Sequence, residues 1–181
     1  MKNIFKNFII LFLISLVSCN GPEEKKINSD NKAITQNEIS FEVDTTNSSI
    51  EWVGTMVGIY KHNGLIAINE GNLSWTGNSF NKGKFSINMN SITQLDTLYK
   101  TAENKLVRHL ESADFFDVMN YPTASFTITE SNSEKNSITG NLTIRGFTNS
   151  ETVSEIVFDK EQETVFGIIS YDLQKYVVFF K

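Results

Sequence analysis

Cysteine, proline and long apolar runs are scarce in this chain. Among its 181 residues there are two prolines and one cysteine, Cys19. A single cysteine cannot form an intrachain disulfide, so burial of apolar side chains must stabilise the fold. The N-terminal apolar run, Phe8 to Val17, is shorter than the ~20 residues that a membrane-spanning helix needs. No later apolar run is long enough to cross a membrane either.

Basic residues are also fewer than acidic ones. Lys and Arg number 16 and Asp and Glu number 21, which gives a net charge of −5. Loss of residues 1–18, which contain Lys2 and Lys6 and no acid, would leave 14 basic against 21 acidic residues and a charge of −7. A chain this acidic, without a dense cluster of Lys and Arg, binds polyanions poorly. We therefore expect no nucleic-acid partner.

The first 19 residues combine three features in the order of an export signal. Lys2 and Lys6 supply positive charge, Phe8 to Val17 are apolar, and Leu16-Val17-Ser18 lead into Cys19. This order resembles the lipobox of bacterial lipoproteins. The resemblance implies cleavage before Cys19, a diacylglyceryl group on its sulfur and acylation of the new amino group, and two or three acyl chains anchor a protein durably. The alternatives are an ordinary cleaved signal and a buried free thiol.

Residues 20–40 are rich in Asn, Lys, Glu and Ser and have almost no large apolar side chain. Such a segment cannot bury enough surface to fold, and a flexible chain of its length reaches roughly 25 Å. We expect a signal peptide over 1–18, a lipidated cysteine and flexible tether over 19–40, and a folded domain over 41–181. Asn20 is not the Asp that retains many lipoproteins in an inner membrane, which favours the outer membrane of a cell envelope, on its periplasmic or surface side.

From Phe41 onward, apolar and polar residues alternate with a period of two between segments rich in Gly, Asn, Asp and Ser. This pattern predicts strands with one buried face. The residues on the predicted buried faces are Ile50, Trp52, Gly54 and Met56; Phe85, Ile87 and Met89; Ala124, Phe126 and Ile128; and Ile138, Gly140, Leu142 and Ile144. Many short strands at regular spacing predict an antiparallel barrel or sandwich.

One segment, residues 97–111, has a period of four instead. Its apolar residues at this spacing are Leu98, Ala102, Leu106 and Leu110. The spacing predicts an amphipathic helix, with Asp96 or Thr97 as the N-cap. Phe115 and Phe116 follow it directly, and we expect them to cover one end of the barrel.

Five short segments follow one another over about a hundred residues: Asn47–Trp52, Met89–Ile92, His109–Asp117, Tyr121–Phe126 and Gly140–Thr148. Together they resemble the YceI-like family, bacterial extracytoplasmic proteins with a lipocalin-like barrel that hold a long isoprenoid chain. The resemblance implies an antiparallel barrel of about eight strands with one helical insertion. A barrel of roughly eight strands encloses either a packed core or one slender ligand.

The resemblance also implies which residues meet the ligand. The inward candidates are Trp52, Met56, Phe85, Ile87, Met89, Phe126, Ile128, Leu142 and Ile144, with Phe115 and Phe116 near one mouth. An ordinary core role fits each of them as well. The ligand would be a quinone or a polyprenyl phosphate, held for transport, storage or a stress-related role. The alternative is an envelope protein-interaction module with a dry barrel core.

An enzymatic or metal-binding role rests on few residues. His62 and His109 are the only histidines, and Asp114 and Asp117 follow His109 closely. A histidine near two acids suits acid–base or metal chemistry, but no second histidine stands at ligand spacing. We expect no enzyme, no cofactor and no metal, and a capping or packing role for His109. For Arg145, a contact with a ligand head group and a surface ion pair are both open, and the ion pair is favoured.

The last segment, Ile168–Lys181, departs from the family pattern. The family commonly has an Arg and a Gly where this chain has Leu173 and Val177, and a further strand usually follows. We therefore expect a barrel that lacks its closing strand. An exposed edge of this kind would favour a homodimer.

Overall fold

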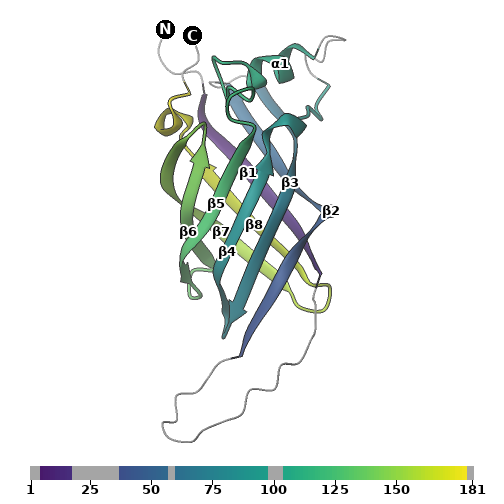
Figure 1. Cartoon of the computed structure of the whole chain (residues 1–181), viewed down its shortest axis with the longest axis vertical. Helices are drawn as coiled ribbons and strands as arrows, with labels where there is room; N and C mark the ends of the chain where they lie inside the picture. Colours follow the sequence, from purple (N-terminus) through teal and green to yellow (C-terminus); the bar gives the residue numbers. More distant parts are fainter. Residues whose placement is uncertain (1–4, 18–36, 57–59, 98–103, 179–181) are drawn as a thin grey trace, which may run out of the picture.

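The computed structural model describes residues 5–17, 37–56, 60–97 and 104–178, and these residues form an antiparallel barrel with one helix (Figure 1). The strands are β1 (Phe5–Val17), β2 (Glu38–Met56), β3 (Tyr60–Thr76), β4 (Ser79–Asn88), β5 (Thr123–Asn132), β6 (Ser137–Ile144), β7 (Phe147–Asp159) and β8 (Thr164–Tyr171). Two 3-10 turns, η1 (Met89–Ser91) and η2 (Leu173–Tyr176), and helix α1 (Lys105–Glu111) complete the described part. The predicted all-β barrel with a helical insertion is confirmed.

Neighbouring strands pair in chain order, and β1 pairs with both β2 and β8 to close the barrel. Strands β2 to β8 thus make seven antiparallel strands, and the eighth position is filled by β1. After β8 the described chain forms η2, and the edge of β8 that a further strand would cover is paired with β1. Cleavage before Cys19 would remove the segment that occupies the eighth position.

The period-two pattern correctly predicted which residues face inward. Every described member of the four predicted faces is buried, including Ile50, Trp52, Phe126 and Leu142. Met89 is buried in η1 rather than in a strand, and the side chain of Met56 lies outside the described part. Strands form here because alternating apolar side chains can be buried on one face while their polar neighbours stay in water.

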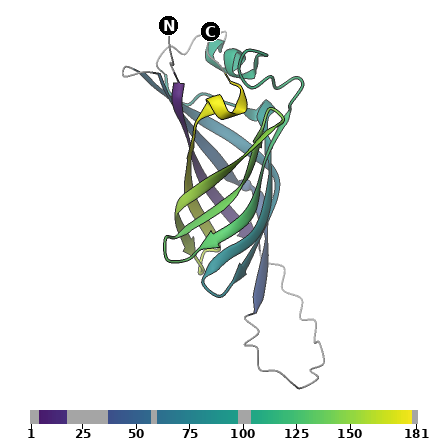
Figure 2. The same ribbon diagram turned by 90° about the vertical axis from the view of Figure 1, so that its left-hand side faces the viewer.

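The predicted helix is confirmed over Lys105–Glu111, but its predicted N-cap is wrong. Asn104 precedes the helix with a φ of 47°, whereas the Asp96 carboxylate accepts hydrogen bonds from the neighbourhood of β3. Leu110 is buried and Leu106 packs against the core, while Leu98 and Ala102 lie outside the described residues. Helix α1 and the loop after it lie over the upper end of the barrel in Figures 1 and 2.

The two ends of the barrel are filled differently. At the upper end, the most deeply buried large side chains are Trp52, Phe115, Phe116, Leu173 and Tyr176. At the lower end, an aromatic cluster consists of Phe41, Trp75, Phe80 and Phe158, with ring centroids 4.8 to 6.5 Å apart. Full burial of one such side chain contributes about 1.5–3 kcal/mol, so both ends stabilise the fold. In the part of the chain that is described, no helix is long and apolar enough to span a bilayer.

Candidate functional site

A narrow apolar cavity of about 60 Å³ runs in the lumen between the two filled ends. It is lined by Ile50, Leu73, Phe80, Phe85, Ile87, Phe126, Ile138, Leu142, Val153, Ile156, Val165, Phe166, Gly167 and Ile169. All these residues are apolar, so the lumen offers dispersion contacts and almost no hydrogen bonds. Its volume is well below the ~300–1,000 Å³ of usual small-molecule sites. A long ligand therefore fits only after side chains move apart.

The residues predicted to meet a ligand divide into two groups. Phe85, Ile87, Phe126 and Leu142 line the cavity. Trp52, Met89, Phe115, Phe116, Ile128 and Ile144 are buried in the same core but are not among its lining residues. The structure thus places the first group at the middle of the lumen and leaves the second as core, which includes Phe115 and Phe116 packed edge to face over the upper end with centroids 4.7 Å apart.

Several lining residues were missed from the sequence. Val165, Gly167 and Ile169 on β8, like Leu73 on β3, are buried at alternate positions, so the same period-two signal could have found them. Phe166, which is partly buried between Val165 and Gly167, also lines the cavity and breaks this alternation. Ile156 carries no such signal. The β7–β8 register shifts between Ser154 and Val157, and Glu155 has a φ of 53°, so this bulge turns Ile156 inward against the alternation.

The rings of Phe126 and Phe85 each pack directly against a glycine of a neighbouring strand. A Cβ atom on Gly140 would lie 2.5 Å from Cζ of Phe126, and one on Gly71 would lie 2.7 Å from Cδ1 of Phe85. Only glycine leaves room for these rings in their present positions. Rotation of the two rings is the simplest way to widen the cavity.

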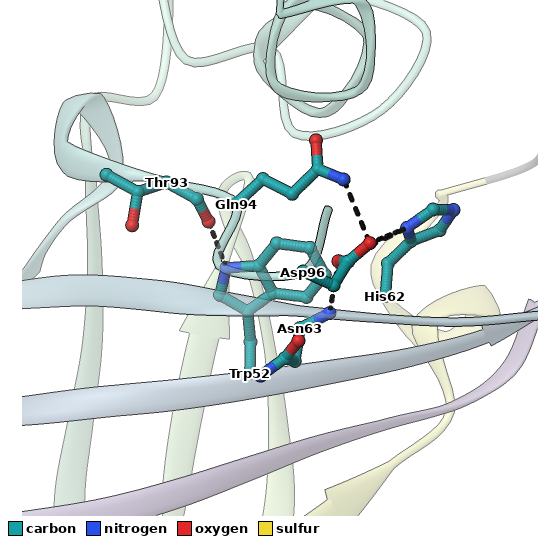
Figure 3. A network of polar contacts seen from close by, with 6 residues as sticks. All are labelled: Trp52, His62, Asn63, Thr93, Gln94 and Asp96. Carbon is teal, nitrogen blue, oxygen red and sulfur yellow. Dashed lines mark hydrogen bonds and ion pairs between the residues drawn. The ribbon is translucent and has the colours of Figure 1, made fainter. Parts of the chain in front are cut away.

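A polar network fastens the connection after η1 to the upper part of β2 and β3 (Figure 3). The Asp96 carboxylate accepts hydrogen bonds from Nδ1 of His62 at 3.1 Å, from the backbone N–H of Asn63 at 3.0 Å and from the Gln94 amide at 3.1 Å. Partial burial raises the pKa of Asp96, but these hydrogen bonds outweigh it and the pKa is lowered overall. Because Nδ1 of His62 is hydrogen-bonded to Asp96, this histidine helps to hold the connection after η1 against β3.

The histidine and the two acids of the HLESADFFD segment do not form a metal site. The His109 ring packs edge to face on Phe115 with centroids 5.5 Å apart, Asp117 accepts from the Asn120 amide, and Asp114 is exposed. Among the described residues, no group of three or more His, Cys, Asp or Glu side chains is placed to hold a metal ion. The packing role expected for His109 is the one observed.

Arg145 binds backbone carbonyls. It sits with Gly146 in the β6–β7 turn, both at positive φ, as a two-residue hairpin turn requires. Its guanidinium donates to the carbonyl oxygens of Ala113 (2.8 Å), Phe115 (3.0 Å) and Val177 (3.1 Å). The surface ion pair favoured from the sequence is not found among the described residues. Arg145 instead ties the loop after α1 and the end of η2 to the barrel.

A buried polar cluster at the end of η2 is not signalled by any local pattern in the sequence. The Glu151 carboxylate, 7% exposed, accepts from Nζ of Lys175 at 3.0 Å and from the Tyr176 hydroxyl at 3.3 Å. Tyr171 packs edge to face on Tyr176 with centroids 5.5 Å apart. Burial, reinforced by the Glu151 carboxylate, raises the pKa of both tyrosines above the usual value. The cluster helps to close the upper end of the lumen.

Comparison with known proteins agrees with this architecture. The YceI-like domain matches residues 41–176, from β2 to η2, and leaves out β1. UPF0312 proteins of Pseudomonas aeruginosa, strains LESB58 and PAO1, are 40% identical over 77 residues, which is 41% of this chain and 37% of theirs. A UPF0312 protein of Pseudomonas paraeruginosa matches to the same extent. The match thus spans little more than a third of the length of these relatives. Because the domain covers most of the chain, this protein belongs to the YceI-like family.

Proposed function

We propose that this protein is a carrier that holds a long-chain isoprenoid lipid in the lumen of its barrel and performs no chemistry on it. The observation that carries the proposal is the lumen itself, whose described lining residues are all apolar. An isoprenoid tail is a thin hydrocarbon that needs such a surface and little else. Removal of apolar surface from water favours binding by about 25 cal/mol per Å² before the cost of ordering the tail.

Binding of a long tail requires the lumen to expand from its volume of about 60 Å³. Phe85 and Phe126 are the side chains that would move, because both rings protrude over glycines. The free-energy cost of moving them opposes the free energy released when the tail leaves water. The same small volume favours the second candidate, an envelope protein-interaction module whose core stays dry.

We further propose that the domain is anchored in the cell envelope through an acylated Cys19, with the outer membrane as its site. Cys19 lies outside the described residues, and the family match begins only at residue 41. Support comes from the order of charged, apolar and small residues before Cys19. Cleavage there would free the edges of β2 and β8 that β1 now pairs, and free edges are the expected route to a homodimer.

Native mass spectrometry with organic extraction tests the carrier function. We would purify the full chain from bacterial envelopes, where it can be processed, and expect a stoichiometric adduct that extracts as an isoprenoid. Leu142→Gln, which puts an amide into the lumen, should lose the adduct. Asn141→Gln, on the exposed neighbouring position, should keep it. A folded protein that stays empty when offered quinones and polyprenyl phosphates would instead support the dry interaction module.

A further inference from the structure

A second cavity, of about 150 Å³, opens at the lower end of the barrel. Its lining residues are Trp75, Asn78, Ser79, Phe80, Asn132, Ser133, Asn136, Ser137, Ile156 and Phe158. They come from the β3–β4 and β5–β6 turns and from the bulged part of β7, which gather at the lower end in Figures 1 and 2. We call this cavity the lower pocket. It is larger than the free space in the lumen.

One layer of side chains separates the lower pocket from the lumen. Phe80 and Ile156 line both cavities. Ile156 is only partly buried and belongs to the β7 bulge, where its backbone N–H donates to the Asn136 carbonyl at 3.0 Å. A small displacement of these two side chains would therefore join the two spaces into one channel.

At the opposite end, the described residues of the barrel pack closely. Trp52, Phe115, Leu173 and Tyr176 are each no more than 1% exposed there. Arg145 adds hydrogen bonds that hold the loop after α1 and the end of η2 over this end. In the barrel as described, with β1 between β2 and β8, the lower pocket is the access to the lumen that the described residues provide.

The chemistry of the lower pocket selects a kind of head group. Its polar side chains are amides and hydroxyls, and none of the described residues that line it carries a charge. The side chains of Asn78 and Asn136 make no hydrogen bond within the described part of the chain, so they are available to a ligand. Trp75 and Phe158 add aromatic rings whose centroids lie 4.9 Å apart.

A phosphate head group does not match these residues. Phosphate oxygens are best bound by Arg and Lys or by clustered backbone N–H groups. Nζ of Lys160 lies 5.0 Å from the centroid of the Trp75 ring in a cation–π contact, so its charge is directed to that ring. Amide donors beside aromatic rings match an uncharged, planar ring with carbonyl oxygens.

We propose that the lower pocket binds the uncharged ring of a quinone, and that its isoprenoid tail passes between Phe80 and Ile156 into the lumen. The proposal rests on the carrier function proposed above and deepens it, because it chooses the quinone class over the polyprenyl phosphates. Asn78 and Asn136 would donate to the ring carbonyls, and Trp75 would lie against the ring.

The chain contains two tryptophans, which makes the position of the head group measurable. Trp52 is at the upper end beside Thr93, and Trp75 lies near the lower end of β3. Quinones quench tryptophan emission on contact. Full-length Trp52→Phe leaves Trp75 as the only emitter, and Trp75→Phe leaves Trp52. Circular dichroism of both variants verifies the fold.

Titration with an isoprenyl benzoquinone should remove most of the emission of Trp75 and leave that of Trp52 nearly unchanged. The isoprenoid alcohol with the same tail should compete for the site without quenching. Asn78→Leu should weaken quinone binding about fivefold, as expected for one lost hydrogen bond. The exposed control Asn141→Leu should leave the affinity unchanged.

Three results would overturn the proposal. Quenching of Trp52 in place of Trp75 would put the head group at the upper end and leave the carrier function intact. A polyprenyl phosphate that binds as tightly as the quinone would refute the selection of an uncharged head. Failure of both lipids and of the alcohol to bind a folded protein would refute the carrier function, and this proposal with it.

Discussion

Nε1 of Trp52 donates a hydrogen bond of 3.0 Å to the backbone carbonyl oxygen of Thr93, 41 residues further along the chain. The bond joins the buried face of β2 to the connection that follows η1. It is possible because residue 64, which faces Trp52 on β3, is a glycine. A Cβ atom there would overlap the Thr93 carbonyl oxygen and lie 2.6 Å from Nε1 of Trp52.

Gly64→Ala should therefore destabilise the protein. The added methyl meets backbone on one side and a fully buried ring on the other, so neither neighbour can yield at low cost. We expect a loss of about 2–3 kcal/mol in the free energy of unfolding, measured by urea denaturation. Asn141→Ala is the control, because Asn141 occupies an exposed strand position. An equal loss in both variants would contradict the proposed close contact.

Asp96→Asn should reduce stability at neutral pH and flatten its dependence on acid. The folded-state pKa of Asp96 is lowered, so its ionised form adds stability above the unfolded-state value of about 3.9, and this is lost as pH falls through the folded-state pKa. The gap between the two proteins should narrow as denaturation is measured from pH 6 to about pH 3. A difference in the free energy of unfolding that stays constant over this range would show that the hydrogen bonds do not stabilise the ionised form of Asp96.

Tyr176→Phe should show the opposite pH behaviour. The folded-state pKa of Tyr176 is raised, mainly by burial, so the neutral phenol adds stability below the unfolded-state value of about 10. That stability is lost as pH rises toward the folded-state pKa. The parent protein should lose stability steeply above pH ~10, and the variant less steeply. Parallel profiles in alkaline denaturation would argue against this role, and Tyr171→Phe tests the second buried phenol in the same way.

Val177→Gly should stabilise the protein. Val177 has a φ of 56°, where a β-branched residue is strained by roughly 1–2 kcal/mol, and its side chain is 40% exposed. Its backbone bonds, from its N–H to Gln174 and from Arg145 to its carbonyl, do not need the side chain. After the entropy cost of glycine, we expect a net gain of about 0.5–1 kcal/mol. Val178→Gly, at a buried position, should instead destabilise, and a loss in both variants would contradict the strain.

Cys19→Ser should release the protein from the membrane and keep residues 1–18 on the chain. The expectation follows from the lipobox-like sequence, since serine has no sulfur for a diacylglyceryl group to modify. Fractionation of envelopes, followed by intact mass measurement, checks both effects. A monomeric Cys19→Ser protein that still sediments with membranes would rule out the proposed anchor.

Local pattern was enough to predict the barrel's inward faces. Phe126 and Leu142 are buried because alternation along an extended chain forces every second side chain to one face. Ile156 escapes this pattern, since a bulge depends on pairing with a neighbouring strand. Local pattern also assigned Asp96 to a helix N-cap, whereas its partners are His62 and Asn63, more than 30 residues away.

The sequence by itself determined the all-β class, the inward and outward faces of the strands, the short helix and the family, because these follow from local periodicity and short motifs. Tertiary structure decided that Arg145 binds carbonyl groups, that Glu151 is buried against Tyr176, and that Phe80 and Ile156 separate two cavities. Each of these depends on chain segments that meet only when the barrel closes. No local pattern encodes such a contact, since its free energy comes from partners distant in the sequence.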